Sequence, residues 1–266
     1  MVKQRLIFTL LMQNSTYMLS RNFSLQVVGD IEWLRKHYHF EAISFSIDEL
    51  IVLNVERGKK DIKQFAAHLI ELSQSCFMPI AAGGGIRSID HAYQLLDAGC
   101  DKLIINSPLI SQEALVRQLV KTFGSQCLVA SIDYLHKRDG STEVYIVNGS
   151  QATGLSVEAC VRRAHDLGCG EIYLTSIDRD GTGQGYDLEL IKQVAETSKV
   201  PVIASGGVGK YSHLADGVTK AKADAVSTAN IFNFIEDGLT EARLEMQARG
   251  IRMAVWDQNF QRTCQK

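Results

Sequence analysis

The chain has no apolar run near the roughly 20 residues that a membrane-spanning helix requires, so we expect no membrane segment. Its first residues, MVKQRLIFTLLMQNSTYMLS, join a basic start to a short apolar stretch and could be mistaken for a signal peptide. Gln13 and Asn14 end that stretch, however, and no small-residue cleavage site follows. We therefore interpret the segment as a first buried strand.

The chain also lacks an excess of either charge, because 28 Lys and Arg stand against 30 Asp and Glu. This balance gives no electrostatic reason to expect a nucleic acid or an anionic membrane as a partner. The seven histidines lack metal-ligand spacing, so we expect no metal and no cofactor. The cysteines lack a CxxC pair, so we expect mostly buried, reduced thiols and a cytoplasmic protein. They are Cys76, Cys100, Cys127, Cys160, Cys169 and Cys264.

What the sequence does contain is an internal repeat at an offset of 122 residues, the separation of Glu49 from Glu171. A period this long exceeds the roughly 20–50 residues of solenoid repeats and indicates a duplicated half-domain. The same shift sets Leu11 against Asp133, so the halves differ where RLIFTLL meets CLVASID. The other matching pairs are Pro79 with Pro201, Gly84 with Gly206, and Gly85 with Gly207.

Short apolar runs alternate with amphipathic segments, which predicts parallel strands separated by helices. Eight such units close as a (β/α)8 TIM barrel of about 250 residues. A doubly wound open sheet is the alternative, but a two-fold repeat of four units each favours closure into two half-barrels. The predicted strands lie near 5–11, 49–54, 79–82, 102–105, 127–133, 171–175, 201–204 and 224–227. The predicted helices lie near 31–38, 60–75, 89–98, 112–122, 156–167, 187–197, 211–219 and 239–248.

We expect one domain over 1–266, because no linker-like or low-complexity stretch divides the chain. Segment 134–148 is an addition after the fifth strand. Its Asp139-Gly140 pair lies between polar and alternating residues, which predicts a hairpin above the barrel.

Glycine is concentrated at two carboxyl ends of strands, where the active site of such a barrel lies. The third strand ends at Gly83-Gly84-Gly85 and the seventh at Gly206-Gly207. Glycine lets backbone N–H groups approach an anion, and a helix N-terminus behind it adds a favourable dipole. Two such loops predict a ligand with two phosphates, whereas tight turns that need no ligand are the alternative. Further donors at the fourth and eighth strand ends are Asn106, Ser107, Ala229 and Asn230.

Carboxylates also occur at the predicted mouth. Asp133 ends the fifth strand and is a candidate general acid–base group, or else a cap or turn residue. Residues 178–182, DRDGT, follow the sixth strand as either a ligand-binding loop or a solvated turn.

Four charged residues begin strands at the opposite end of the barrel. They cannot all enter a dry core unless they pair, and two of each sign could form a closed ring. Such a ring could be an electrostatic plug for the barrel floor. The four residues are Arg5, Glu49, Lys102 and Glu171.

Taken together, five motifs resemble the cyclase subunit of imidazole glycerol phosphate synthase over about 5–250 of the chain. They are AAGGGIRS, GCDKLIINS, FGSQCLVASID, GEIYLTSIDRDGTGQGYDLEL and VPVIASGGVGK. The resemblance implies a glutaminase partner whose ammonia travels through the barrel. At the mouth the family incorporates it into a two-phosphate ribulosyl substrate, a lyase step of histidine biosynthesis.

The resemblance also assigns roles to individual residues. It makes the four charged residues a gate at the ammonia entrance and directs Asp101 toward the glutaminase. One phosphate site falls on Gly85, Asn106 and Ser107, with Ser107 where threonine is usual. Active-site positions fall on Asp133 and Thr175. The other phosphate site falls on Asp180, Gly181, Gly207, Ala229 and Asn230, with Asn230 in place of serine.

The chain departs from the family at the first strand. Leu11 replaces the aspartate that pairs with Asp133, Leu19 replaces the lysine of the following loop, and Asn54 replaces a second-strand aspartate. A leucine cannot transfer a proton, and each such loss commonly costs about 10²–10⁴ in rate. Ordinary cyclisation should therefore be weakened or lost.

Three functions remain open. The first resembles the divergent cyclase-like subunits that serve a glutaminase and a sugar amidotransferase in lipopolysaccharide O-antigen synthesis. The second is a working cyclase with Asp133 and a substitute for Leu11. The third is a free-standing barrel that binds a phosphosugar without any glutaminase.

Overall fold

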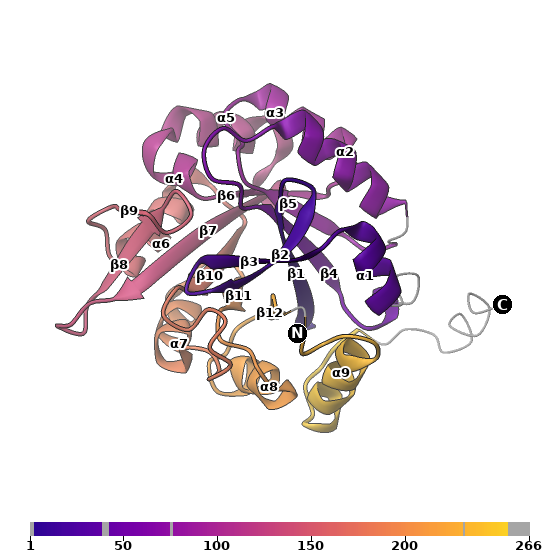
Figure 1. The fold of residues 1–266 in the computed structure, drawn as a ribbon. Coiled ribbons are helices and arrows are strands. Elements are labelled where there is room, and N and C mark those ends of the chain that lie inside the picture. The colour runs from indigo at the N-terminus through magenta and orange to yellow at the C-terminus, as the bar shows by residue number, and fades with distance from the viewer. Residues whose placement is uncertain (1–2, 39–42, 75–76, 231, 255–266) are drawn as a thin grey trace.

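Eight parallel strands close into a barrel in the computed structural model, which describes residues 3–38, 43–74, 77–230 and 232–254. The pairing of β10 with β7 completes the circle, and helices surround the strands (Figure 1). The predicted (β/α)8 TIM barrel is therefore confirmed. In barrel order the strands are β1 (Arg5–Gln13), β4 (Glu49–Asn54), β5 (Ile80–Gly83), β6 (Lys102–Ile105), β7 (Leu128–His136), β10 (Glu171–Ser176), β11 (Val202–Ser205) and β12 (Ala225–Thr228).

The surrounding helices turn an apolar face toward the strands. In α2 (Ile62–Ser73) the buried residues recur at i, i+3, i+4, i+7 and i+10 from Ile62. The side chain of Asp61 caps this helix by accepting from the backbone N–H of Lys63 and Gln64. The predicted first and last residues of each helix differ by at most two positions from those of an observed helix. The other helices are α1 (Ile31–His37), α3 (Ile89–Asp97), α4 (Ser107–Ser111), α5 (Glu113–Phe123), α6 (Val157–Leu167), α7 (Leu188–Thr197), α8 (Tyr211–Thr219) and α9 (Gly238–Ala248), with short 3₁₀ turns at Ile43–Phe45 and Ser125–Cys127.

Two antiparallel extensions rise from the carboxyl ends of the barrel strands. β7 pairs with β8 (Thr142–Ile146), and β8 with β9 (Gln151–Ala152), in and beside the segment where the sequence predicts a hairpin. The other extension, in which β1 pairs with β2 (Thr16–Arg21) and β2 with β3 (Ser24–Gly29), was not predicted. In Figure 1 β2 and β3 cross the near end of the barrel.

Both turns of this β2–β3 extension have the left-handed backbone conformation that glycine usually adopts. Asn14-Ser15 and Asn22-Phe23 have positive φ at both residues, as in two-residue turns of β-hairpins. Neither pair contains glycine, so the sequence carries only the weaker signal of asparagine at the first position.

Side chains alternate along each strand, so every second residue faces the barrel axis. In β1 these are Arg5, Ile7, Thr9 and Leu11, from the bottom of the barrel to its mouth. One residue of each strand joins an apolar cluster around the axis, between the bottom of the barrel and its mouth, which we call the apolar layer. The layer consists of Ile7, Ile51, Ala81, Ile104, Val129, Tyr173, Ile203 and Ala225.

Within the described residues, no helix combines the length and apolar character that crossing a bilayer would take. Cys100, Cys127, Cys160 and Cys169 are buried free thiols. Burial raises the pKa of Cys100 to about 12, which makes this thiol unreactive. Cys76 and Cys264 lie outside the described residues.

Candidate functional site

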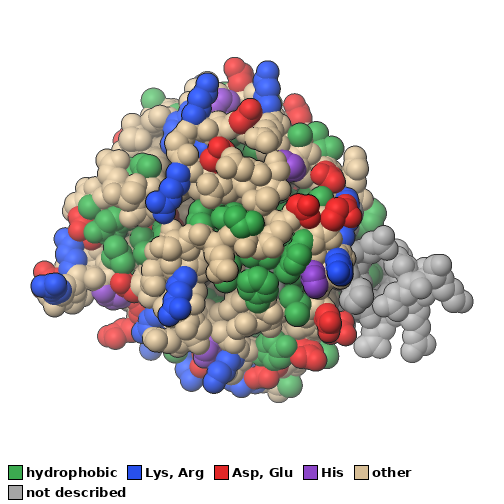
Figure 2. All heavy atoms as spheres, in the orientation of Figure 1, with side chains coloured by type: hydrophobic (Ala, Val, Ile, Leu, Met, Phe, Trp, Pro, Cys, Tyr) green, Lys and Arg blue, Asp and Glu red, His purple; other side chains and the backbone are tan. Residues whose placement is uncertain are grey.

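A cavity of about 720 Å³ occupies the carboxyl end of the barrel, and we call it the mouth cavity. Its volume lies in the range of small-molecule sites. Figure 2 views this end, where hydrophobic side chains gather over the middle of the face. The residues predicted from the sequence that line the cavity are Leu11, Asn54, Gly84, Gly85, Asn106, Ser107, Asp133, Thr175, Asp180 and Ala229. The lining, as far as the described residues define it, leaves out Gly181, Gly206, Gly207 and Asn230.

Asp133 lies in the cavity wall with two hydrogen-bond partners. Its Oδ2 accepts from Asn106 Nδ2 at 3.1 Å, and its Oδ1 from Ser131 Oγ at 3.4 Å. Burial raises the pKa of Asp133 to about 7, the hydrogen bond from Ser131 opposes this, and the charge of Asp180 adds to it. A carboxyl group with a pKa near neutrality can both donate and accept a proton, as general acid–base work requires.

The wall across the barrel from Asp133 is apolar at Leu11, where the family carries an acid. Leu11 of β1 pairs in register with Leu53 of β4, and both side chains line the cavity. The Asn54 side chain accepts from the backbone N–H of Glu56 at 3.0 Å. Leu19 packs against the outer core, whereas the next residue, Ser20, reaches the cavity. A lysine at position 19 would therefore point away from Asp133 unless the hairpin moved.

In each half of the repeat, the same close backbone contact explains why the loop needs a glycine. A Cβ on Gly84 would come within 2.1 Å of the Asn54 carbonyl oxygen, and one on Gly206 within 2.7 Å of the Ser176 carbonyl oxygen. Positions 54 and 176 are themselves related by the repeat. Close backbone approach thus requires these glycines, so evidence for a ligand has to come from the surrounding groups.

The second glycine loop packs closely against Gly185 and does not line the mouth cavity. Gly185 N donates to Gly207 O at 2.7 Å, and a Cβ on Gly207 would lie 2.2 Å from Gly185 O. The amide of Asn230 donates to Val208 O at 3.4 Å, and its oxygen accepts from Asn233 N. The two glycine loops therefore differ in their place relative to the cavity, although the sequence predicts two equivalent loops at one mouth.

The β2–β3 extension is hydrogen-bonded to the loop after β10, which contains Asp180. Ser20 Oγ donates to Asp180 Oδ2 at 2.5 Å, and the same oxygen accepts from Phe23 N at 3.1 Å. Asn22 N donates to Asp180 O, and a Cβ on Gly181 would meet Ser20 O at 2.2 Å. Burial raises the pKa of Asp180, against the effect of these hydrogen bonds.

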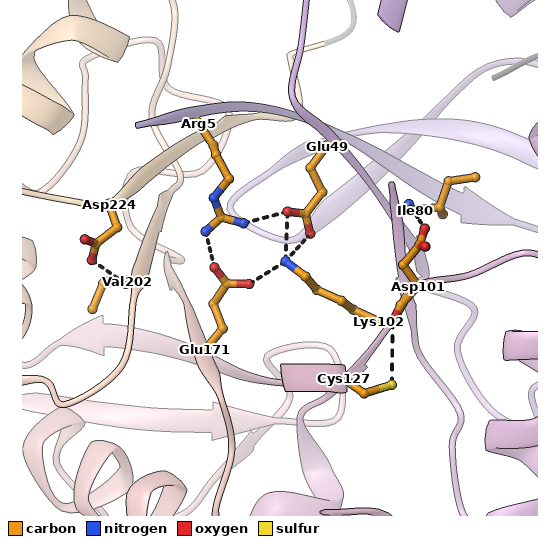
Figure 3. Close-up of polar contacts among 9 residues, drawn as sticks. All are labelled: Arg5, Glu49, Ile80, Asp101, Lys102, Cys127, Glu171, Val202 and Asp224. Atoms are coloured by element: carbon orange, nitrogen blue, oxygen red, sulfur yellow. Dashed lines mark hydrogen bonds and ion pairs between the residues drawn. The ribbon is translucent and has the colours of Figure 1, made fainter. Parts of the chain in front are cut away.

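At the opposite end of the barrel, four side chains form a closed ring of alternating charge, which we call the charged ring (Figure 3). Arg5 donates to Glu49 at 2.6 Å and to Glu171. Lys102 Nζ lies 2.9 Å from a carboxylate oxygen of each glutamate. Both glutamates are buried. Burial alone lowers the pKa of Arg5, but Glu171 and Glu49 outweigh it, so the pKa is raised.

Asp101 belongs to a repeated backbone contact on the same side of the barrel. Its Oδ2 accepts from Ile80 N at 2.8 Å, as Asp224 accepts from Val202 N at 2.9 Å (Figure 3). Asp101 therefore has a structural role of its own, and its exposure leaves it accessible to a partner.

Four hydroxyls inside the barrel were not singled out from the sequence, and we call them the hydroxyl cluster. Tyr173 OH lies 2.9 Å from Ser205 Oγ and 3.3 Å from Thr9 Oγ1, and Thr9 lies 2.8 Å from Ser227 Oγ. Tyr173 and Ser205 also line the mouth cavity. A tyrosine in the run EIYL, facing inward by strand parity, was the signal that could have identified them.

Tyr173→Phe should lower the free energy of unfolding by about 1–2 kcal/mol, because Ser205 and Thr9 lose a buried partner. Urea denaturation measures the change. Tyr145→Phe, on the partly exposed face of β8, is the control and should change stability by less than about 0.5 kcal/mol. Equal effects of the two substitutions would show that the cluster adds nothing.

Among the described residues, no group of three or more His, Cys, Asp or Glu side chains has an arrangement suited to a metal ion. The expectation of no metal is not tested by this observation.

Comparison with known proteins gives a match to a family model and many similar proteins, of which one relative is described here. The family model described as "Histidine biosynthesis protein" matches residues 24–236. A relative from Parasynechococcus marenigrum (strain WH8102), named "Putative imidazole glycerol phosphate synthase subunit hisF2", is 40% identical over 257 residues. The match covers 96% of this chain and 95% of the relative.

Proposed function

This chain belongs to the histidine biosynthesis protein family, and on that premise we propose that it conducts ammonia from a glutaminase without performing ordinary cyclisation. The family match and the relative support the general part of this assignment, a barrel similar to the cyclase subunit of imidazole glycerol phosphate synthase. The glutaminase partner, the ammonia route and a phosphate-containing ligand at the mouth are parts of the proposal.

One combination carries the proposal: the charged ring is complete while the acid–base pair at the mouth is not. All four members of the ring are present and paired. Asp133 faces Leu11 and Leu53 where a second proton-transfer group would be needed. Selection for stability alone does not require buried ions, because apolar residues of similar volume often stabilise a core as well. A ring kept for transport accounts for the difference between the two ends.

The route between the ends suits a neutral molecule. Above the charged ring lies the apolar layer, in which Ala81 and Ala225 are the smallest members. Tyr173 belongs to that layer, and its OH joins the hydroxyl cluster, which reaches the floor of the mouth cavity. Ammonia can pass an apolar layer at far lower cost than ammonium, since burying an unpaired charge is prohibitive. The hydroxyls would then offer it hydrogen bonds before the mouth.

We propose that the ammonia serves a sugar amidotransferase in lipopolysaccharide O-antigen synthesis or a related glycan pathway. The loss of the family's carboxylate at Leu11 and of its lysine at Leu19 supports an acceptor other than the histidine-pathway substrate.

The partner part of the proposal is tested with the purified chain and a glutaminase from the same organism. We expect co-elution in gel filtration and a rise in glutamine hydrolysis of at least tenfold on mixing. Unchanged hydrolysis, with both proteins folded, would favour a free-standing barrel.

An active cyclase is the second candidate, favoured by one observation. Asp133 retains a pKa near 7 and hydrogen bonds from Asn106 and Ser131, so one half of the acid–base pair is in place. Complementation of a histidine auxotroph that lacks its cyclase decides for this candidate. Failure with soluble protein decides against it.

A further inference from the structure

Lys60 is a half-buried amine in the wall of the mouth cavity. Its stem lies beside the first glycine loop, where a Cβ on Gly85 would come within 3.0 Å of it. The Nζ of Lys60 donates to the Asn54 carbonyl oxygen at 2.6 Å. This partner is neutral, whereas the Nζ of Lys102 in the charged ring lies 2.9 Å from two carboxylates. The fold therefore holds the Lys60 amine in place without fixing a charge on it.

The surroundings of Lys60 favour its neutral form. Burial, followed by the charge of Arg87, lowers the pKa of Lys60 from 10.5 to about 8, although Glu56 raises it. At pH 7 the neutral fraction of this amine is then about one tenth, instead of about 1 in 3,000. A neutral amine can donate one N–H to Asn54 and keep its lone pair for a reaction. Burial and a neighbouring cation are two means by which proteins activate a lysine as a nucleophile.

The cavity has room and polar groups for a small carbonyl compound that carries hydroxyls. Its volume is about 720 Å³. Thr175 is 7% exposed in its wall, and among the described residues none hydrogen-bonds the Thr175 Oγ1. A buried hydroxyl without a partner is costly, so a ligand hydroxyl beside it would be stabilised. Asp133 lines the same cavity, and its pKa of about 7 lets it supply a proton at neutral pH.

We propose that Lys60 is a nucleophilic lysine that captures a small hydroxy-aldehyde or hydroxy-ketone as an imine. The nitrogen of neutral Lys60 attacks the carbonyl carbon, and a proton moves from this nitrogen to the carbonyl oxygen to give a carbinolamine. Asp133 protonates the new hydroxyl, which leaves as water while the C=N bond forms, and the iminium nitrogen returns the proton. This site goes beyond the proposed function and does not depend on the ammonia route.

Reductive labelling of the wild-type chain tests the site without any substitution. The chain is incubated at pH 7 with D-glyceraldehyde and cyanoborohydride, which reduces an imine to a stable secondary amine. Peptide mass spectrometry then quantifies each modified lysine. The neutral fraction favours Lys60 about 300-fold over an ordinary lysine, and its lower basicity offsets about tenfold of this, by analogy with thiols. We expect Lys60 to be labelled at least tenfold faster than Lys63, which is exposed on α2.

Two outcomes of the labelling would overturn the proposal. One is a ratio of Lys60 to Lys63 below tenfold, because the cavity would then not activate Lys60. The other is a preference for Lys60 that persists in concentrated urea, since a preference of the unfolded chain cannot arise from the cavity. Lys60→Met should remove the fast-labelled position, whereas Lys63→Met should leave it unchanged.

Two substitutions of neighbouring charges distinguish activation of Lys60 from simple access to it. Arg87→Met removes a cation that lowers the pKa of Lys60, so its labelling at pH 7 should slow several-fold. Glu56→Gln removes an anion that raises this pKa, so labelling should become faster. Thermal melting checks that both variants fold. Faster labelling in Arg87→Met would contradict the proposal, because it would show that the shorter side chain merely opens a path to the amine.

The hydroxylated class of substrate is tested with propionaldehyde, which matches glyceraldehyde in chain length but carries no hydroxyl. We expect the ratio of Lys60 to Lys63 labelling to be several-fold lower with propionaldehyde. Thr175→Val should remove this difference, because the unpartnered hydroxyl is then absent. Equal ratios for the two aldehydes in the wild type would reject a hydroxylated substrate.

Discussion

Replacing Arg5 with methionine should lower the free energy of unfolding by about 3–5 kcal/mol, because it leaves two buried carboxylates with one cation. Glu49 and Glu171 have side chains only 3% and 8% exposed, and Lys102 would remain their sole charged partner within the ring. Urea denaturation of the isolated chain at pH 7 measures the change.

Arg117→Met is the matched control, because Arg117 pairs with Glu113 at 2.8 Å on the surface of α5. An exposed pair of this kind contributes at most about 0.5 kcal/mol. A loss at Arg5 no larger than at Arg117 would mean that the charged ring does not hold the barrel floor together.

The same Arg5 variant tests whether the charged ring is a gate for ammonia or a structural plug. If the ring gates ammonia, the folded variant in complex with the glutaminase should release ammonia to the medium and fail to deliver it to the acceptor. If the only consequence is reduced stability, with delivery unchanged, the ring is a structural plug.

Asp133→Asn should stabilise the protein at pH 8, by on the order of 4 kcal/mol, and have little effect at pH 4. The pKa of Asp133 rises from its ordinary 3.8 to about 7 in the folded chain. Between these values the folded state keeps a proton that the unfolded state has released. The contribution of Asp133 to stability is therefore full below about pH 4 and is lost as the pH rises through 7.

Unfolding curves of the wild type and Asp133→Asn at pH 4, 6 and 8 test this prediction. Asp139→Asn, in the exposed turn before β8, should show no gain at pH 8, because hydrogen bonds from Ser141 lower the pKa of Asp139. A constant difference between Asp133→Asn and the wild type over this range would mean that Asp133 is already ionised at pH 4.

The barrel could be predicted because its strands are short apolar runs and its helices have apolar residues at helical spacing. The β2–β3 extension could not, because its turns place Ser15 and Phe23 in a left-handed backbone that sequence alone does not predict for them. The short helix α4 was missed since five residues are too few to show a period.

The charged ring could be predicted because charges at strand starts must pair inside a barrel. The difference between the two glycine loops could not be predicted. It depends on how the β2–β3 extension folds over Asp180 and on the packing of Gly185 against Gly207. Lys60 was also missed, since its position in the cavity follows from its packing beside Gly85.

The central claim is tested most directly by giving the chain and its glutaminase ¹⁵N-amide glutamine together with the histidine-pathway substrate. Glutamate and the cyclised product are then quantified from the same reaction. The account predicts stimulated glutamate formation with cyclised product below about 1% of it, since lost acid–base groups cost about 10²–10⁴ each. Equal amounts of glutamate and labelled imidazole product would contradict it.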